Sequence, residues 1–434
     1  STSSLVPLRL RLRVEVLLTR CLVDLERFGE VFEKHAKFAS LMEASEDLWT
    51  RAHHQLNLGF LAKHQKQIHQ SIAFFRKAAS LSQTHQFAKL EIAARSELST
   101  LLWHEDEFQQ GLGEFTIALE RCVARGDLQI ADGIMRFGGS FYQTKDLELS
   151  YEYLKASLTE AKASQNLPLQ ICMTLLVTMQ ALMLNRFGDL HTALIEVTMF
   201  NQLFDSKLYH LMTYYMKGRL SYALGRYKES KAYFTEIRHY ADEINHTKFR
   251  VLGRTHGGVM ALALGDLEEA QVLSEHSIHL VQKIKAPNFL CNAYESAAIV
   301  YEGLGQYDKA KSAYQEAYQL AQALQFRKAV QIRSAAGIAW IDFQQGEHQK
   351  AMVQVEQALP TLLSPDTFYA VEPGWSYWKV YQILSQTQPS IAQEVLQCAK
   401  MVLDKMAANI EEPMHRKSFL EQVTWNRLLH TTSL

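Results

Sequence analysis

Short turns that recur about every 40 residues constrain the fold of this chain more than any other feature. The clearest copies read ALGRYKES, ALGDLEEA, GLGQYDKA and QQGEHQKA, and their glycines, Gly225, Gly265, Gly305 and Gly346, are separated by 40, 40 and 41 residues. A weaker copy, FGDLHTA, places Gly188 at 37 residues before Gly225. Self-similarity at a period of about 20 to 50 residues indicates a repeat array. We therefore take the turn glycine of each copy as the anchor of one repeat.

The same frame continues through the rest of the chain without the glycine. The further anchors are Glu26, Lys66, Asp106, Lys145 and Thr387. Seven residues before the ten anchors stand Thr19, Gly59, Ser99, Gly138, Ala181, Gly218, Gly258, Ala298, Ala339 and Val380. Five residues after them stand Val31, Ser71, Gly111, Ser150, Ala193, Ser230, Ala270, Ala310, Ala351 and Ala392. Because large side chains would hold two crossing helices apart, these columns of small residues predict ten pairs of antiparallel helices.

The best copy, Cys291 to Leu324, resembles the tetratricopeptide repeat. It carries the family's residues at Tyr294, Ala298, Tyr301, Gly305, Tyr307, Ala310, Tyr314 and Ala317. The resemblance implies an all-α fold, a right-handed α-solenoid of about ten tetratricopeptide-like helix pairs with a C-terminal capping helix. Each pair buries its apolar face only by stacking on its neighbours. Because the period exceeds the family's ~34 residues, we expect a longer second helix or a longer link to the next pair.

The expected organisation is one array with flanking segments and no domain boundary inside it. Residues 1–11 are interpreted as a linker from an upstream region, because the chain lacks an initiator Met and is expected to have been cut or processed from a longer protein. The array is expected over residues 12–410, with a long loop at 360–374 that holds three of the eight prolines. Residues 411–434 are expected to form a capping helix and tail, since Pro413 can open a helix.

The C-terminal segment carries a second resemblance. The residues concerned are Pro373, Trp378, Tyr381, Leu384, Ala392, Leu396, Ala399, Ile410, Arg416, Ser418, Phe419, Leu420, Val423, Asn426 and Arg427. They look like the end of large bacterial signalling proteins in which a STAND-type P-loop ATPase precedes a long tetratricopeptide-like array. The array of the maltose regulon activator is similar in architecture. The resemblance implies that the array is a sensor, which binds an inducer or partner and controls an upstream ATPase or effector domain.

Composition excludes several other classes of function. Lys+Arg is 45 and Asp+Glu is 46, so the chain lacks the basic surplus expected for direct nucleic-acid binding. Its most apolar window, Met173 to Leu184, has 12 residues, whereas a membrane span needs about 20. The five cysteines are far apart, which favours reduced thiols in a cytoplasmic protein over a disulfide framework.

The sequence contains no catalytic or nucleotide-binding motif of the kinds G-x-x-x-x-G-K-[ST], G-x-S-x-G or H-E-x-x-H. We therefore expect no enzyme activity in this chain. The 17 histidines have no cysteine or carboxylate partners at a metal-ligand spacing. Neither a metal nor a cofactor is expected.

The expected ligand site is the concave groove, which the first helix of each pair lines in tetratricopeptide arrays. Positions three, six and ten residues before an anchor should point inward. The candidate ligand-binding residues are Trp103, Tyr142, Asn185, Tyr215, Arg219, Tyr222, Glu295 and Trp340. An inward Arg219 could bind a carboxylate or a phosphate, and tyrosine suits apolar and polar contacts alike. The alternative for Arg219 is an ion pair within the protein or contact with solvent.

These observations predict a non-catalytic regulatory array. It would bind a protein, a peptide or a small-molecule inducer in its groove and control an upstream domain of the same polypeptide, and it could also oligomerise. The alternative is a free-standing tetratricopeptide scaffold for protein–protein interaction. An enzyme is the weakest hypothesis, because the sequence contains no catalytic constellation. Turnover of a substrate that is lost on mutating an inward carboxylate such as Glu295 would support it.

Overall fold

In the computed structural model the described residues form helices and no strands, and the chain divides into two compact units. The described residues are 7–24, 27–124, 146–203, 207–284, 287–324, 328–364 and 372–433. Unit 1 is Ser1–Met173 and unit 2 is Thr174–Leu434. This division was not predicted, because the repeat frame runs through it without a break in composition. None of the described helices combines the length and the apolar character that crossing a membrane requires.

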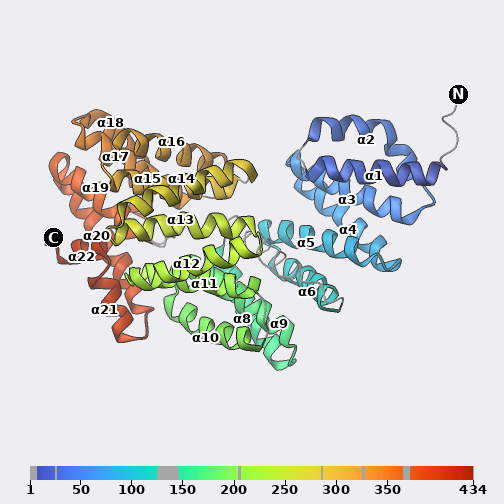
Figure 1. Ribbon diagram of the computed structural model, residues 1–434, viewed down its shortest axis with the longest axis horizontal. Helices are drawn as coiled ribbons and strands as arrows, with labels where there is room; N and C mark the ends of the chain where they lie inside the picture. Colours follow the sequence, from blue (N-terminus) through green and yellow to red (C-terminus); the bar gives the residue numbers. More distant parts are fainter. Residues whose placement is uncertain are drawn as a thin grey trace. The chain divides into compact units, whose positions relative to one another are not determined.

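The helices follow one another in the order that the repeat frame predicts (Figure 1). Unit 1 contains α1 (Leu8–Asp24), α2 (Phe28–Glu43), α3 (Leu48–His64), α4 (Ile68–Thr84), α5 (Ala88–His104), α6 (Phe108–Ala124) and α8 (Leu147–Ala163). The boundary between the units falls inside α9 (Leu167–Met183). Unit 2 continues with α10 (Phe187–Leu203), α11 (Lys207–Ala223), α12 (Tyr227–Glu243), α13 (Thr247–Ala263), α14 (Leu267–Ile284), α15 (Pro287–Gly303), α16 (Tyr307–Ala323), α17 (Lys328–Gln344), α18 (His348–Leu362), α19 (Pro373–Thr387), α20 (Pro389–Ala408), α21 (Pro413–Glu421) and α22 (Thr424–Thr431).

Helix length explains the period of 40. The helices α3, α4, α5 and α6 each contain 17 residues, and three-residue turns at 65–67, 85–87 and 105–107 separate them. Two such helices and two such turns make one repeat. Both helices of these pairs have the same length, and the turn inside a pair is as long as the link to the next pair.

Six of the predicted anchors adopt the left-handed backbone conformation that ends the first helix of a pair. They are Lys66, Asp106, Gly225, Gly265, Gly305 and Gly346, with φ between 60° and 82°. In the fifth pair this conformation belongs to Asn185 (φ 56°), whereas Gly188 lies inside α10. The anchor assigned to Gly188 was therefore wrong. Asparagine tolerates the left-handed region better than most residues, and with Asn185 the step to Gly225 is 40 residues.

The two columns of small residues meet where the helices of a pair cross. The Ser71 hydroxyl donates to the Gly59 carbonyl oxygen at 2.7 Å, and the Ser230 hydroxyl donates to the Gly218 carbonyl oxygen at 2.8 Å. A Cβ on Gly111 would lie 3.0 Å from the Ser99 carbonyl oxygen. The predicted close approach is confirmed in these pairs. The corrected fifth pair departs from the rule, because its two positions hold Thr178 and Leu190, both fully buried.

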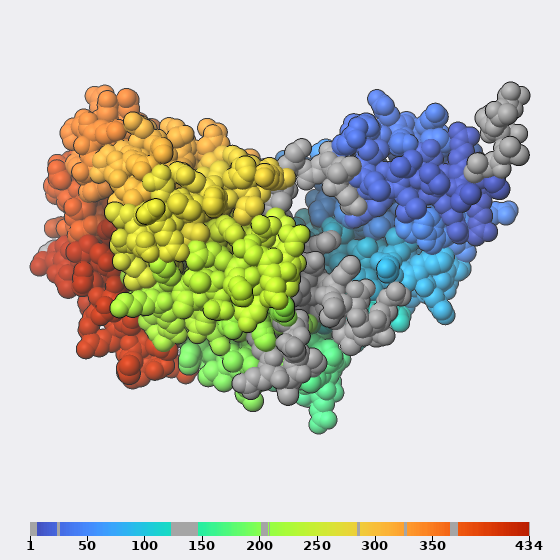
Figure 2. Space-filling model, in the orientation of Figure 1, coloured from blue at the N-terminus to red at the C-terminus, as the bar shows by residue number. Residues whose placement is uncertain are grey.

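The C-terminal tail closes unit 2 on itself. It forms two short helices, α21 and α22, where one capping helix was expected, because the chain turns between Glu421 and Thr424. The Asn409 carbonyl oxygen accepts from the Gly188 backbone N–H at 3.0 Å, and the Ser418 hydroxyl donates to the Leu224 carbonyl oxygen at 2.6 Å. The red tail therefore packs against the green helices at the start of unit 2, as well as against α19 and α20 (Figure 2).

The flanks of the predicted array also differ in detail. α1 begins at Leu8, inside the segment 1–11 that was interpreted as a linker. In the predicted loop at 360–374, α18 includes Pro360 and extends to Leu362, and α19 begins at Pro373. Residues 365–371 of that loop lie outside the described residues.

Replacing Gly59 by alanine tests the close approach in unit 1. The new Cβ would lie 2.5 Å from the ring of the buried Phe75. We expect a loss of about 1–3 kcal/mol in the free energy of unfolding from overpacking, measured by urea unfolding. Gly113→Ala in α6 is the control, because its Cβ would meet nothing within 4 Å and alanine favours a helix over glycine by about 1 kcal/mol. Equal effects of the two changes would contradict the packing argument.

Gly188→Ala tests the attachment of the tail. Its Cβ would lie 2.6 Å from the Asn409 carbonyl oxygen, so the backbone contact between α10 and the tail cannot form unchanged. We expect faster limited proteolysis near residues 409–412 and a loss of about 1–3 kcal/mol in the stability of unit 2. An unchanged cleavage rate would show that the tail does not depend on this contact.

Candidate functional site

Charged and aromatic side chains from four first helices converge inside unit 2. We call Tyr222, Glu295, Glu302, Arg333, Glu372 and Lys379 the inner cluster. They come from α11, α15, α17 and α19 and from the residue that precedes α19. Tyr222, Glu295 and Glu302 stand at the predicted inward positions, three or ten residues before their anchors. The repeat frame thus brings together residues up to about 150 positions apart, as in the contact of Tyr222 with Glu372.

One half of the inner cluster surrounds Arg333. Its Nε lies 3.4 Å from Oε1 of Glu295, and the Tyr222 hydroxyl donates to Glu372. Burial raises the pKa of Glu372, although Arg333 and the Tyr222 hydrogen bond favour its charged form. Burial would lower the pKa of Arg333, but Glu295, Tyr222 and Glu372 together leave it raised. Arg333 therefore stays charged, and Glu295, Tyr222 and Glu372 all interact with its charge.

The other half surrounds Glu302. This carboxylate accepts from the Tyr314 hydroxyl at 2.9 Å and forms an ion pair with Lys379. The Lys379 Nζ lies 4.9 Å from the centre of the Trp340 ring and 4.6 Å from that of Trp375. Burial lowers the pKa of Lys379, and Glu302 opposes this effect. The ammonium group is thus held by one carboxylate and two aromatic faces.

The charges of the inner cluster determine which ligand it could accept. It holds three carboxyl groups and two cations, and burial raises the pKa of one of these carboxyl groups, that of Glu372. Buried ion pairs gain little net stability, because desolvation offsets the attraction between the charges. A ligand carboxylate that replaced Glu372 would meet the Tyr222 hydroxyl and the Arg333 guanidinium.

Three further predicted site residues, Tyr215, Arg219 and Trp340, lie on α11 and α17. Tyr215 and Arg219 lie together on α11, where Arg219 Nη1 donates to the Tyr215 hydroxyl at 3.0 Å. Trp340 joins the inner cluster through Lys379.

Two other predicted site residues, Asn185 and Trp103, do not belong to the inner cluster. Asn185 is the left-handed turn residue before α10, so it does not sit on the inward face of a first helix. Trp103 is fully buried in unit 1 against Phe108, at 4.9 Å between ring centres. Its place in the core overturns the groove position predicted for it. Tyr142 lies outside the described residues.

Sequence reasoning missed Arg333, Glu372 and Lys379, which the structure brings into the inner cluster. Arg333 and Lys379 stand 13 and 8 residues before their anchors, outside the positions taken as inward. Glu372 lies in the link between α18 and α19, which no helical period describes. A lone charged residue in each apolar run was the available signal, since AVQIRSAAGIAW and GWSYWKVYQIL each contain one.

The tail contact forms a second concave site in unit 2. A cavity of about 320 Å³ is lined by Phe187, Gly188, His191, Leu220, Leu224, Ile410, Glu411, Glu412 and His415. Ligand atoms of His191, Glu412 and His415 lie within 4.8 Å of one another, and such a set could hold a divalent cation. Arg226 Nη1 lies 2.8 Å from His415 Nε2, so a guanidinium already stands beside these residues. His191 stands more than 220 positions before Glu412 and His415, so a motif search could not find the set.

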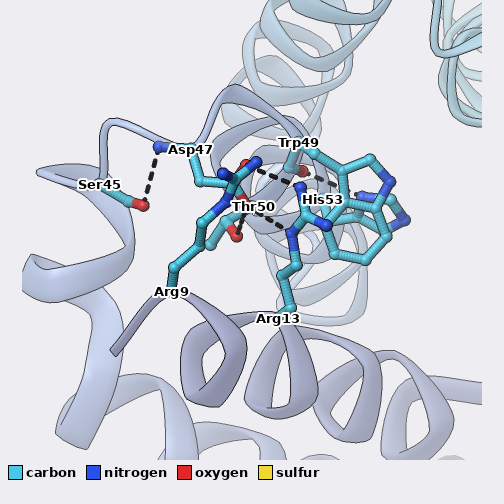
Figure 3. A network of polar contacts seen from close by, with 7 residues as sticks. All are labelled: Arg9, Arg13, Ser45, Asp47, Trp49, Thr50 and His53. Atoms are coloured by element: carbon cyan, nitrogen blue, oxygen red, sulfur yellow. Dashed lines mark hydrogen bonds and ion pairs between the residues drawn. The ribbon is translucent and has the colours of Figure 1, made fainter. Parts of the chain in front are cut away.

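Unit 1 contains a larger concavity at the start of α1 and α3. It has a volume of about 790 Å³, and its lining includes Arg9, Arg13, Asp47, Trp49 and Phe87. Arg13 binds both carboxylate oxygens of Asp47, at 2.8 and 2.9 Å, and Arg9 adds a contact at 3.0 Å (Figure 3). These hydrogen bonds, those from Arg13 first, hold the pKa of Asp47 well below its usual range. Asp47 precedes α3, so the network fixes α1 on the α2–α3 turn.

Comparison with protein families identifies tetratricopeptide repeats in this chain. One tetratricopeptide repeat model matches residues 289–364, and a second matches residues 55–85 and 213–237. These segments fall on α15–α18, α3–α4 and α11–α12. A search of curated proteins finds no match.

Several solved structures resemble the chain in fold. A Rap protein complexed with competence and sporulation factor aligns with a TM-score of 0.49 at 11% identity, over 78% of this chain and 96% of that one. The apo form of RapI aligns at 0.47 and 12%, over 92% and 99%. NprR in complex with its cognate peptide NprX aligns at 0.46 and 14%, over 70% and 83%. The likeness concerns the helical array and assigns no ligand to this chain.

The raised pKa of Glu372 predicts a pH-dependent stability of unit 2. The folded unit binds this proton more tightly than the unfolded chain, whose carboxyl has the ordinary pKa of 4.5. The free energy of unfolding should therefore decrease as the pH rises above that value. Glu372→Gln removes the titration and keeps an acceptor for Tyr222, so it should gain stability relative to wild type between about pH 5 and about pH 8.

Urea unfolding of both proteins at the two pH values checks this prediction. Glu316→Gln is the control, because Glu316 is exposed on α16. A stability difference between Glu372→Gln and wild type that does not change with pH would contradict it.

Proposed function

We propose that this chain is the non-catalytic sensor array of a signalling protein and that its ligand binds at the inner cluster of unit 2. The observation that carries the proposal is the convergence of Tyr222, Arg333 and Glu372 on the inner side of stacked first helices. Polar groups that converge among aromatic side chains are the usual form of a ligand site. The class of ligand is a peptide, a protein segment or a small molecule that carries a carboxylate.

Glu372 acts in this proposal as an internal competitor. It occupies the position of the ligand carboxylate and shields Arg333 when no ligand is present. Burial raises the pKa of Glu372, so its charged form is disfavoured in this position. Because Glu372 directly precedes α19, its displacement would act on the start of α19 and thus on the last pair, to which the tail attaches.

The signal would then pass to a regulatory domain of the same polypeptide. By resemblance to bacterial STAND-type proteins this domain is an ATPase or another effector. The alternative function is a free-standing scaffold that uses the same site for partner peptides. The reading frame before the codon for Ser1 discriminates between them, since a nucleotide-binding motif there favours the sensor and a start codon favours the scaffold.

Binding of short peptides to single-residue variants tests the site. The probe is a pool of peptides with free C-terminal carboxylates, compared with the same peptides carrying C-terminal amides, in calorimetry or fluorescence anisotropy. Arg333→Ala should weaken carboxylate binding by about tenfold to a hundredfold, the effect of losing a hydrogen bond to a charged group. Glu372→Gln should tighten it, because the internal competitor loses its charge. Arg219→Ala, nearby on α11, should weaken it less than Arg333→Ala.

Arg238→Ala is the matched control, because Arg238 pairs with Glu269 between second helices, away from the inner cluster. It should bind like wild type. Equal binding of carboxylate and amide peptides, or equal affinities in Arg333→Ala and Arg238→Ala, would remove the inner cluster as the ligand site. Mass spectrometry of molecules that copurify with the array would identify the natural ligand.

A further inference from the structure

Three side chains of the types that bind zinc meet where the tail packs on α10. We call His191, Glu412 and His415 the tail triad. His191 stands near the start of α10, Glu412 directly precedes α21, and His415 lies on the first turn of α21. One nitrogen of each imidazole and one oxygen of the carboxylate lie within 4.8 Å of one another. Ligand atoms of a tetrahedral zinc ion are about 3.4 Å apart, since each lies about 2.0–2.1 Å from the ion, so small side-chain rotations would close the set around one ion.

His415 is held as a neutral imidazole between Arg226 and Glu412. Arg226 directly precedes α12, and its Nη1 donates to Nε2 of His415 at 2.8 Å. On the same ring, Nδ1 lies 2.9 Å from Oε2 of Glu412. A guanidinium can only donate, so the proton of this ring is on Nδ1. The neutral imidazole is the form that binds a metal ion.

The surroundings of the tail triad already hold a cation that can be exchanged. Arg226 forms an ion pair with Glu229 at 2.6 Å, and its side chain is 39% exposed. Glu411 lines the same cavity as the triad and adds a further carboxylate. Arg226 can therefore turn toward solvent and keep Glu229 as its partner when a metal ion takes its place.

We propose that the tail triad binds a zinc ion, which displaces Arg226 and fixes the tail on α10. Two imidazoles and one carboxylate suit Zn²⁺, whereas Mg²⁺ prefers oxygen ligands. Arg226 has to leave whichever ring nitrogen of His415 binds the ion, because Nε2 either becomes the ligand or carries the proton that Nδ1 gives up. The fourth position of the ion is left to water, for which the adjoining cavity of about 320 Å³ has room.

The ion would connect two parts of the chain that are far apart in the sequence. One ligand comes from α10 and two come from the tail, next to the backbone contact of Gly188 with Asn409. The expectation of no metal site rested on spacing along the chain, which a set spread over more than 220 positions does not show. The tail triad shares no residue with the inner cluster, so zinc binding does not depend on the ligand proposed there.

Titration with Zn²⁺ in calorimetry tests the site. Wild type should bind one zinc ion that EDTA removes, and His191→Ala and His415→Ala should each weaken this binding by at least about tenfold. Arg226→Ala should tighten it, because no guanidinium has to leave. The matched control is His276→Ala/His279→Ala, which removes two exposed histidines three positions apart on α14 and should bind like wild type. Equal affinities in wild type and His191→Ala would overturn the site, and Arg226→Ala that binds no more tightly would overturn the displacement.

Limited proteolysis tests whether the ion holds the tail on α10. A glutamate-specific serine protease, which needs no zinc, should cleave after Glu411 more slowly when Zn²⁺ is present. His191→Ala should lose this protection, because the set then lacks its ligand on α10, and equal circular dichroism of the two proteins without zinc would show that the variant is folded. Cleavage of wild type at the same rate with and without Zn²⁺ would contradict the role of the ion in attaching the tail.

Discussion

The fold depends on the close approach of two antiparallel helices within each repeat. Where they cross, serine and glycine stand in place of larger residues, and the serine hydroxyl donates to the carbonyl oxygen of the glycine, as in Ser71 with Gly59 and Ser230 with Gly218. A pair held this closely is thin and leaves apolar surface on both of its sides. Stacking covers that surface, and every larger feature of the molecule follows from how the stack begins, curves and ends.

In unit 2 the C-terminal tail packs against the first helices of the same unit. The tail helices join the last pair to the turns beside α10 and α11, and Gly188 is needed there because the Asn409 carbonyl leaves no room for a Cβ. Closure brings Glu372 to Tyr222 and concentrates charge on the inner side of the first helices. The same geometry that completes the stack therefore creates the site proposed for the ligand. Unit 1 has no comparable closure among its described residues, and α1 keeps one apolar face exposed.

Much of the architecture could be predicted from single residues in a fixed frame. The turns at Gly225, Gly265 and Gly305 and the small residues around them specify helix pairs because their cause is local, a left-handed turn and a crossing point. The repeat frame misplaced the turn of the fifth pair, where Asn185 has the left-handed conformation and Gly188 contacts the tail. Glycine was taken as the turn signal, but a glycine can equally mark close contact with a distant segment.

The candidate site was predictable only in part, for a physical reason. The helical period predicted that Tyr222, Glu295 and Glu302 share one side of their helices, because a residue's side of a helix follows from its position in the sequence. It could not determine that Glu372, in a link without a period, reaches Tyr222, or that Lys379 lies between Trp340 and Trp375. The sequence by itself determined the repeat and its length, and it predicted the inward faces in part. Only the tertiary structure decided which helix faces meet. Each pair adds a small rotation to the stack, so its curvature depends on many pairs together, and the contacts of the tail then fix that curvature.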